Sequence, residues 1–374
     1  MEPKVYQYQS PFSLESGVIL PQLTIAYHTY GSYSAGKKVA WVCHALTANA
    51  DAQDWWKGVV GEGSLLNTND YFIVCANIIG SCYGSTGPTS ADAIEHNLSF
   101  NNFPLVTIRD MVQAHILLRA HLKIDTIDIL LGGSMGGYQA LEWALMEPAV
   151  IKKMFLIASS ASESAWGVAI HTAQRLAIEA DATWKEPSIN AGQKGLKAAR
   201  AIGMLTYRNY GIYQEKQTDE DAEKIDNFKA SSYIQYQGDK LVNRFNAHSY
   251  WLLTKSMDSH HLARKRGGDL KKILSTIQTP TLIIGISSDI LCPLQEQRFM
   301  EQHMPFATMV VIDSAYGHDG FIIESAQINS HLKAWLSTEN FQLKQSEFFR
   351  IFNLLKTTYE ILKTNWGVFI FSKA

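Results

Sequence analysis

Five consecutive residues, Gly132-Gly133-Ser134-Met135-Gly136, surround one serine with glycines. They satisfy the G-x-S-x-G pattern of a nucleophile elbow, a sharp strand-to-helix turn that projects a serine hydroxyl from the carboxyl edge of a sheet. An apolar run precedes the motif and a helical pattern follows it, as such a turn requires. The pattern predicts Ser134 as a nucleophile, against the alternative of a glycine-rich turn with an incidental serine. A dinucleotide-binding loop fits less well, because the G-x-G-x-x-G spacing is absent.

A serine nucleophile needs a general base, and the base needs an acid to orient it. In α/β-hydrolases these partners follow the serine in the order acid, then histidine. Asp289 comes directly after the strand pattern LIIGISS, and His318 lies in a loop after the next pattern, MVVID. Both are expected to reach the sheet edge that carries Ser134. The competing candidates are Asp313 and Asp319 for the acid, and His260, His261 and His303 for the base.

An oxyanion formed at Ser134 needs backbone N–H donors. Met135 follows the nucleophile at the start of a helix, whose positive end adds to the stabilisation. A second donor is expected from a loop after an early core strand. The segment WVCHALTAN fits that description, and we assign the donor to Leu46. The alternative is that His44-Ala45 is only a strand end.

Apolar runs alternate with helical patterns over much of the chain. Buried runs alternating with amphipathic helices predict an α/β fold with a mostly parallel sheet covered on both faces. Between about Glu163 and Leu274 helical patterns dominate, which indicates a helical insertion, interpreted as a lid. The strand patterns are KVAWVCHAL, DYFIVCANII, TIDILLGGS, IKKMFLIASSA, TPTLIIGISSDILCP and ATMVVIDSAYGHDGF; the helical ones are TIRDMVQAHILLRAHL, MGGYQALEWALM, ESAWGVAIHTAQRLAIEA, GQKGLKAARAIGMLTYRNY and LVNRFNAHSYWLLTKSMDS.

Composition argues against several classes of function. The 374 residues carry a net charge of -2, so no basic field exists for nucleic acid or an anionic membrane. No stretch approaches the roughly 20 apolar residues that span a bilayer, and the start lacks a signal-peptide pattern. The four cysteines form no C-x-x-C pair, and no metal cluster or tightly bound cofactor is expected. We expect a cytoplasmic protein.

Several longer strings resemble the homoserine O-acetyltransferase family of methionine biosynthesis: CHALTAN, NIIGSCYGSTGP, FPLVTIRDMVQAH, GGSMGGYQALEWA, ARAIGMLTY and YGHDGF. The resemblance runs from about Gln9 to Trp335. It implies an α/β-hydrolase core (residues 1–163 and 275–337) with an inserted helical lid (164–274) and a homodimer formed through the lids. The tail (338–374) does not resemble the family, and its role stays unassigned.

The resemblance also implies roles for single residues. The family's triad falls on the serine, aspartate and histidine already selected. Its carboxylate-binding arginine and nearby tyrosine look like Arg200 and Tyr207, which lie seven apart on one face of a predicted helix. Without the resemblance, Arg200 would be interpreted as a solvent-facing charge. Asp319 looks like the residue that takes the substrate ammonium, and Asn49 is placed near the pocket. Ala48 stands where many relatives have glycine.

The expected function is transfer of acetyl from acetyl-CoA, as co-substrate, to the hydroxyl of L-homoserine by a ping-pong route. Three alternatives stay open at this point. The first is another donor or acceptor, such as succinyl-CoA or serine. The second is a plain serine esterase, and the third is a non-enzymatic binding protein with a hydrolase fold.

Overall fold

The computed structural model describes residues 2–34 and 36–337. The chain forms two compact units, residues 1–332 and residues 333–374. The unassigned tail, 338–374, lies outside the described residues. Within the described part of the chain, no helix has both the length and the apolar character needed to cross a membrane.

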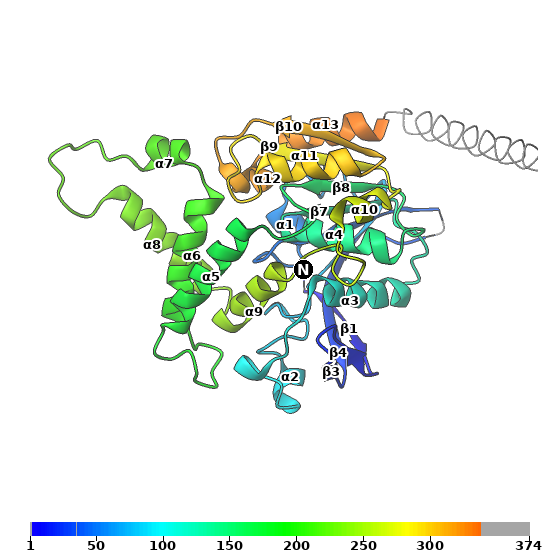
Figure 1. Ribbon diagram of the computed structural model, residues 1–374, viewed down its shortest axis with the longest axis horizontal. Helices are drawn as coiled ribbons and strands as arrows, with labels where there is room; N and C mark the ends of the chain where they lie inside the picture. The colour runs from blue at the N-terminus through cyan, green and yellow to red at the C-terminus, as the bar shows by residue number, and fades with distance from the viewer. Residues whose placement is uncertain (1, 35, 338–374) are drawn as a thin grey trace, which may run out of the picture. The chain divides into compact units, whose positions relative to one another are not determined.

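An eight-stranded sheet, ordered β1-β4-β6-β5-β7-β8-β9-β10, forms the core of the first unit (Figure 1). β1 and β4 pair antiparallel, as do β4 and β6, and all the other pairs are parallel. β6, β7, β8 and β9 are buried along their whole length, as expected for strands covered on both faces. The strands are β1 (Lys4–Tyr8), β4 (Leu23–Tyr30), β5 (Lys38–Cys43), β6 (Tyr71–Ala76), β7 (Ile129–Gly133), β8 (Met154–Ile157), β9 (Thr281–Ile286) and β10 (Ala307–Ile312), with a separate small hairpin of β2 (Phe12–Ser13) and β3 (Ile19–Leu20).

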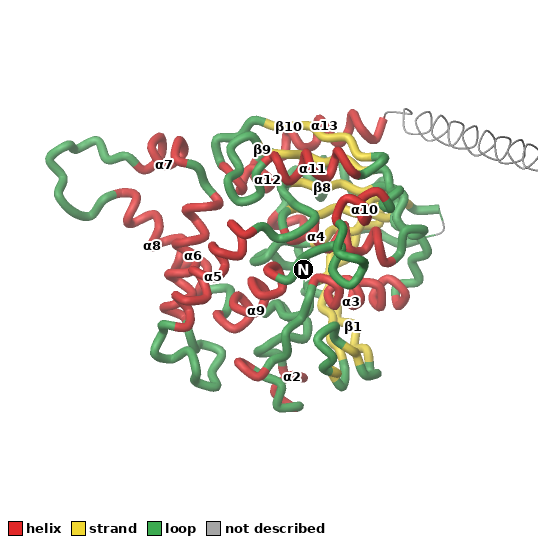
Figure 2. The backbone as a smooth tube through the Cα atoms, in the orientation of Figure 1, coloured by secondary structure: helices red, strands yellow, loops and turns green. Residues whose placement is uncertain are grey.

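Helices flank the sheet (Figure 2). α3 begins at a capping box in which Thr107 and Asp110 satisfy each other's backbone N–H groups. The helices outside the insertion are α1 (Ala52–Trp55), α2 (Ala91–Glu95), α3 (Ile108–His121), α4 (Met135–Met146), α11 (Leu294–His303), α12 (Gly320–Ile323) and α13 (Ser325–Ser337), with short 3-10 turns η1 (Phe100–Asn102) and η2 (Gly317–Asp319).

The insertion between β8 and β9 is helical; α5 to α9 gather on one side of the sheet, whereas α10 packs against α11 (Figure 1). α5 packs against α6 and α9, and α6 packs against α8. Its members are α5 (Ala165–Glu179), α6 (Gln193–Tyr207), α7 (Tyr210–Gln217), α8 (Lys229–Val242), α9 (Ala247–Asp258) and α10 (Leu270–Ser275).

The six strand patterns of the sequence are all strands, and four of its five helical patterns coincide with α3, α4, α5 and α6. The fifth, LVNRFNAHSYWLLTKSMDS, is not one helix: α8 ends at Val242 and α9 begins at Ala247. Asn246 has extended backbone and its side chain accepts from the N–H of Ser249, so it starts a new helix. The antiparallel strands β1 and β4 were not predicted.

Candidate active site

Ser134 sits on the sharp turn between β7 and α4. Its φ of 53° and ψ of -127° are unusual for a residue with a side chain. The turn is held from both sides of the serine: its N–H donates to the carbonyl of Ile157, and its own carbonyl accepts from the Ser159 hydroxyl, each at 3.0 Å. Backbone dihedral angles of this kind cost free energy and persist only where the surrounding contacts hold them in place. Residues with such strain cluster at functional sites.

The glycines around Ser134 are required by space. A Cβ on Gly132 would lie 2.1 Å from the carbonyl oxygen of Gly136. A Cβ on Gly136 would lie 2.1 Å from the carbonyl oxygen of Cys43, on the neighbouring strand β5. Backbone therefore packs directly on backbone, which explains why only glycine fits on either side of the serine.

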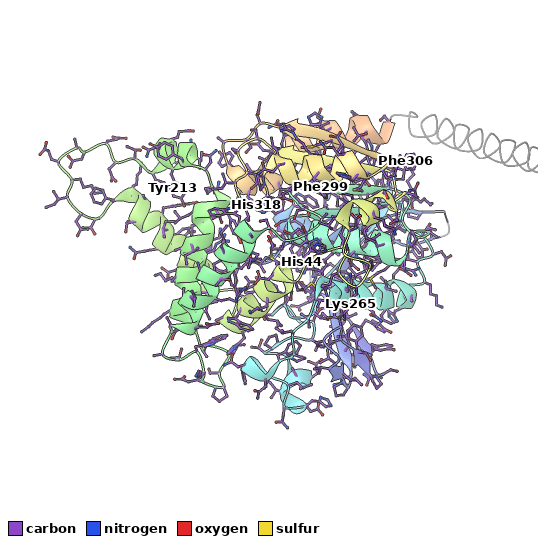
Figure 3. All side chains as sticks on the ribbon, in the orientation of Figure 1. His44, Tyr213, Lys265, Phe299, Phe306 and His318 are labelled. Carbon is purple, nitrogen blue, oxygen red and sulfur yellow. The ribbon has the colours of Figure 1, made fainter. Side chains whose placement is uncertain are left out.

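A continuous hydrogen-bonded chain joins Ser134, His318 and Asp289. Nε2 of His318 lies 2.9 Å from the Ser134 hydroxyl, and Nδ1 lies 2.7 Å from Oδ2 of Asp289. The other carboxylate oxygen accepts from the N–H groups of Leu291 and Cys292, at 2.8 and 2.9 Å. These bonds fix the imidazole with Nδ1 protonated and Nε2 directed at the serine, the arrangement of a general base. Figure 3 shows His318 at the side of the sheet that faces the insertion.

The electrostatics of His318 favour its charged form. Burial by itself lowers the pKa of the imidazole, but the Asp289 carboxylate outweighs that effect, with smaller contributions from Asp319 and Glu163, so the pKa is raised. An imidazolium formed during proton transfer is thereby stabilised.

Three of the competing candidates, Asp313, His260 and His303, make their contacts elsewhere. Asp313 is exposed, and Nε2 of His260 faces the carbonyl oxygen of Ser160 at 3.1 Å. Burial lowers the pKa of His260 to about 3. Nδ1 of His303 bonds within its own helix, to the carbonyl of Phe299. None of these contacts involves Ser134, so the structure brings together the set chosen from chain order.

The loop after β5 carries Leu46 and is fixed by a buried histidine. His44 places Nδ1 2.9 Å from the carbonyl of Ala45 and accepts from the N–H of Ile78 at Nε2. Burial lowers its pKa to about 4, so the ring is neutral and serves as a brace. Figure 3 marks His44 inside the core.

The two backbone N–H groups that are expected to bind the oxyanion remain available for a ligand. Leu46 lines the cavity beside Ser134, and Met135 is the first residue of α4. Among the described residues, neither backbone N–H donates a hydrogen bond to another protein group.

The triad opens into a cavity of about 420 Å³, between the sheet edge and the insertion. Arg200 and Tyr207, both on α6, line it, and the guanidinium lies over the tyrosine ring, 5.2 Å from its centroid. Arg200 Nε is buried with no hydrogen-bond partner, and within the described chain the side chain makes no ion pair. A guanidinium in a cavity, with no described carboxylate within ion-pair distance, is a natural place for a ligand carboxylate.

Asp319 lines the same cavity but already has a cationic neighbour. Nε of Arg208 lies 3.0 Å from its Oδ2, an ion pair whose geometry is not that of a hydrogen bond. Burial raises the pKa of Asp319, against the lowering effects of Arg208, Arg200 and His318. A carboxylate has about four acceptor positions, so this pair leaves capacity for a second cation.

Comparison of the chain with known proteins identifies its family. Residues 42–325 match the model of the alpha/beta hydrolase fold. A homoserine O-acetyltransferase from Cyclobacterium marinum is 43% identical over 91% of this chain and 97% of its own length. The chain belongs to the homoserine O-acetyltransferase family. A crystal structure of a homoserine O-acetyltransferase from Staphylococcus aureus superimposes with a TM-score of 0.77, at 28% identity, covering 93% of this chain and 99% of that one.

An acetylester hydrolase from Corynebacterium glutamicum shares the fold as well. Its TM-score is 0.79 at 22% identity, covering 90% of this chain and 96% of that one. At that identity the likeness shows the fold alone. The family shown by the curated relatives agrees with the resemblance found in the sequence strings.

Asn49, which was expected near the pocket, lines the cavity, and so does its neighbour Ala48. The Asn49 side chain accepts from the N–H of Asp51 at 2.9 Å, which closes a local turn.

Sequence reasoning did not single out four polar cavity residues that belong to the insertion. His171 pairs with Asp258 at 2.9 Å, and Gln174 keeps a buried carbonyl oxygen without a partner. Lys240 and Arg244 stand at the end of α8. All four belong to the insertion, three on its helices and Arg244 just after the end of α8, and no short motif marks them.

Three side chains at the triad could in principle bind a metal ion, because their ligand atoms all lie within 4.8 Å of one another. They are those of Asp289, Cys292 and His318. Asp289 and His318 are bonded to each other, and burial raises the pKa of the Cys292 thiol well above its ordinary value. A protonated thiol is a poor metal ligand, so this chemistry fits the triad better than a metal.

Proposed function

We propose that this protein transfers an acetyl group from acetyl-CoA to the hydroxyl of L-homoserine through an acetyl-serine intermediate. One observation carries the proposal: the Ser134–His318–Asp289 chain opens into a cavity that is also lined by Arg200, which forms no ion pair with any described residue. The first part can form and break an acyl-enzyme, and the second can hold the carboxylate of an amino acid. Membership of the homoserine O-acetyltransferase family supports the same activity.

In the first half-reaction, His318 Nε2 takes the proton of Ser134 as the serine oxygen attacks the thioester carbonyl. The N–H groups of Leu46 and Met135 would hold the tetrahedral oxyanion, each donor being worth about 10²–10³ in rate. The carbon–sulfur bond then breaks, the imidazolium returns its proton to the sulfur, and CoA leaves as the free thiol. The acetyl group remains on Ser134.

In the second half-reaction, the homoserine hydroxyl replaces the thiol. His318 takes its proton as the hydroxyl oxygen attacks the acetyl carbonyl. The bond to Ser134 breaks, and the serine oxygen recovers a proton from the imidazolium. Asp289 holds the imidazole in place throughout and stabilises its charged form.

Transfer must compete with hydrolysis of the acetyl-enzyme. Arg200 would bind the homoserine carboxylate and Asp319 its ammonium, which positions the hydroxyl and favours attack by proximity. Residues of the insertion line the cavity, and its helices would limit access of water to the acetyl-enzyme. A plain esterase has no need of such a clamp.

One assay tests this proposal: release of free thiol from acetyl-CoA or succinyl-CoA, with homoserine, serine or water as acceptor. We expect fast release with acetyl-CoA and homoserine, and a burst of one equivalent with acetyl-CoA alone. Ser134→Ala should abolish that burst. Preference for succinyl-CoA or serine would identify the alternative transferase, and equal rates with and without an acceptor would identify an esterase. The homodimer, the cytoplasmic location and the place in methionine biosynthesis remain predictions from the family.

A further inference from the structure

Two exposed cations stand where the cavity meets solvent. Lys240 lies in the last turn of α8 and Arg244 lies two residues after the helix ends, and both line the cavity that contains Ser134. Arg200, by contrast, is largely buried in the same cavity. The cavity therefore carries positive charge at two depths.

Among residues 2–34 and 36–337, no carboxylate lies within ion-pair distance of either cation. Lys240 makes no hydrogen bond or ion pair with any described residue. In the described part of the chain, the hydrogen bonds of Arg244 go to neutral acceptors: Nη1 donates to the carbonyl of Thr47 and, at 2.7 Å, to the hydroxyl of Tyr83.

Two acidic side chains of this region have lysines of their own. Asp54 also lines the cavity, and its carboxylate lies 3.8 Å from Nζ of Lys57. Asp239 precedes Lys240 in the chain and lies 2.6 Å from Nζ of Lys197. An anionic ligand at the mouth would therefore meet two cations whose charge is not already balanced.

The size of the cavity indicates which part of the acyl-CoA donor must lie at the mouth. About 420 Å³ is near the lower end of the range for small-ligand sites. It suits an acetyl group, part of the pantetheine arm and an amino acid. With the thioester at Ser134, the nucleotide end of CoA, with its diphosphate and ribose phosphate, must extend past the mouth.

We propose that Lys240 and Arg244 bind the phosphate groups of the acyl-CoA nucleotide. This rests on the proposed function, since it assumes a CoA thioester as donor. The arginine offers a planar fork for phosphate oxygens and the lysine a mobile point charge. Because both are exposed, their effect is screened by salt and acts on capture of the donor.

Lys240 gives the cleaner test of the two. Arg244 also anchors the carbonyl of Thr47, the residue after Leu46, so its loss would disturb the oxyanion loop as well. Lys194, an exposed lysine on α6 that does not line the cavity, supplies a matched control with the same change of net charge.

The experiment uses the full chain as wild type, Lys240→Glu and Lys194→Glu. It compares acetyl-CoA with acetyl-pantetheine, which lacks every phosphate, with homoserine as acceptor. We expect Lys240→Glu to raise the ratio of the KM for acetyl-CoA to that for acetyl-pantetheine by about tenfold. The ratio should fall toward the wild-type value at high salt, and Lys194→Glu should keep the wild-type ratio. An unchanged ratio in Lys240→Glu, or an equal rise in both KM values, would overturn the assignment.

A binding measurement keeps the two proposals separable. Calorimetry with CoA alone needs no turnover, and we expect Lys240→Glu to weaken CoA binding by about tenfold relative to Lys194→Glu. Equal binding by both variants overturns the phosphate site. Wild-type protein that binds CoA through Lys240 yet never acetylates homoserine contradicts the proposed function instead.

Discussion

Nδ1 of His318 lies 2.7 Å from Oδ2 of Asp289, and this bond decides which ring nitrogen faces Ser134. The carboxylate is buried, and its second oxygen is held by two backbone N–H groups, so the acceptor cannot turn away. The imidazole is thereby locked in the tautomer that can accept a proton from the serine.

Asp289→Asn should lower kcat by about 10⁴-fold, because an amide NH₂ facing Nδ1 favours the wrong tautomer. The measurement is the rate of the acetyl-CoA burst, together with thermal unfolding. The fold should remain intact, since the replacement is nearly isosteric. A burst within tenfold of wild type, in a folded variant, would contradict the role of this pair.

Arg200→Lys should raise the KM for homoserine by about ten- to a hundredfold, because an ammonium cannot bind a carboxylate through two parallel N–H groups. The first half-reaction does not involve the amino acid, so the burst with acetyl-CoA is the internal control. Should the burst slow as much as the second step, Arg200 would not be an acceptor-binding residue.

The pH profile of kcat/KM for acetyl-CoA should have its acid limb above pH 6.5. His318 accepts a proton only when neutral, and Asp289 raises its pKa despite burial, so activity is lost as pH falls through that raised value. Asp319 contributes to the rise, so Asp319→Asn should move the midpoint to lower pH. A midpoint below 6.5 in the wild type, or an upward shift in the variant, would contradict this account.

Gly136→Ala should destabilise the fold by at least about 3 kcal/mol, because the new Cβ would overlap the Cys43 carbonyl. Gly211→Ala is the matched control: it lies in α7, is exposed, and meets only Asn209 Oδ1 at 3.4 Å. That change should be neutral or stabilising by up to about 1 kcal/mol. Urea denaturation measures both, and similar midpoints for the two variants would show that the close approach is not needed.

The part of the site that sequence could predict depends on local pattern and chain order. The glycines around Ser134 imply a tight turn, and the strand patterns before Asp289 and His318 put both residues at the carboxyl edge of one parallel sheet. Parallel strands bring their carboxyl ends together whatever the length of chain between them. For this reason the triad could be chosen from the sequence although Ser134 and His318 are 184 positions apart, and the structure places the two within hydrogen-bond distance.

Other features needed the folded chain. The break between α8 and α9 depends on the Asn246 cap, which a continuous apolar pattern hides. The strands β1 and β4 pair antiparallel at the sheet edge, where the alternation of strand and helix gives no guide. Nothing near Arg208 marks it as the partner of Asp319, because their contact joins the end of α6 to the turn η2.

The sequence by itself determined the sheet, the elbow and the three residues that meet at its edge, because periodicity and turn chemistry are local properties. Only the tertiary structure decided how the insertion covers that edge. It places Arg200 inside the cavity without an ion pair to any described residue, puts Lys240 and Arg244 at the mouth, and pairs Asp319 with Arg208. Those outcomes depend on helix packing between distant segments, whose geometry is set by side-chain contacts that no single stretch of sequence contains.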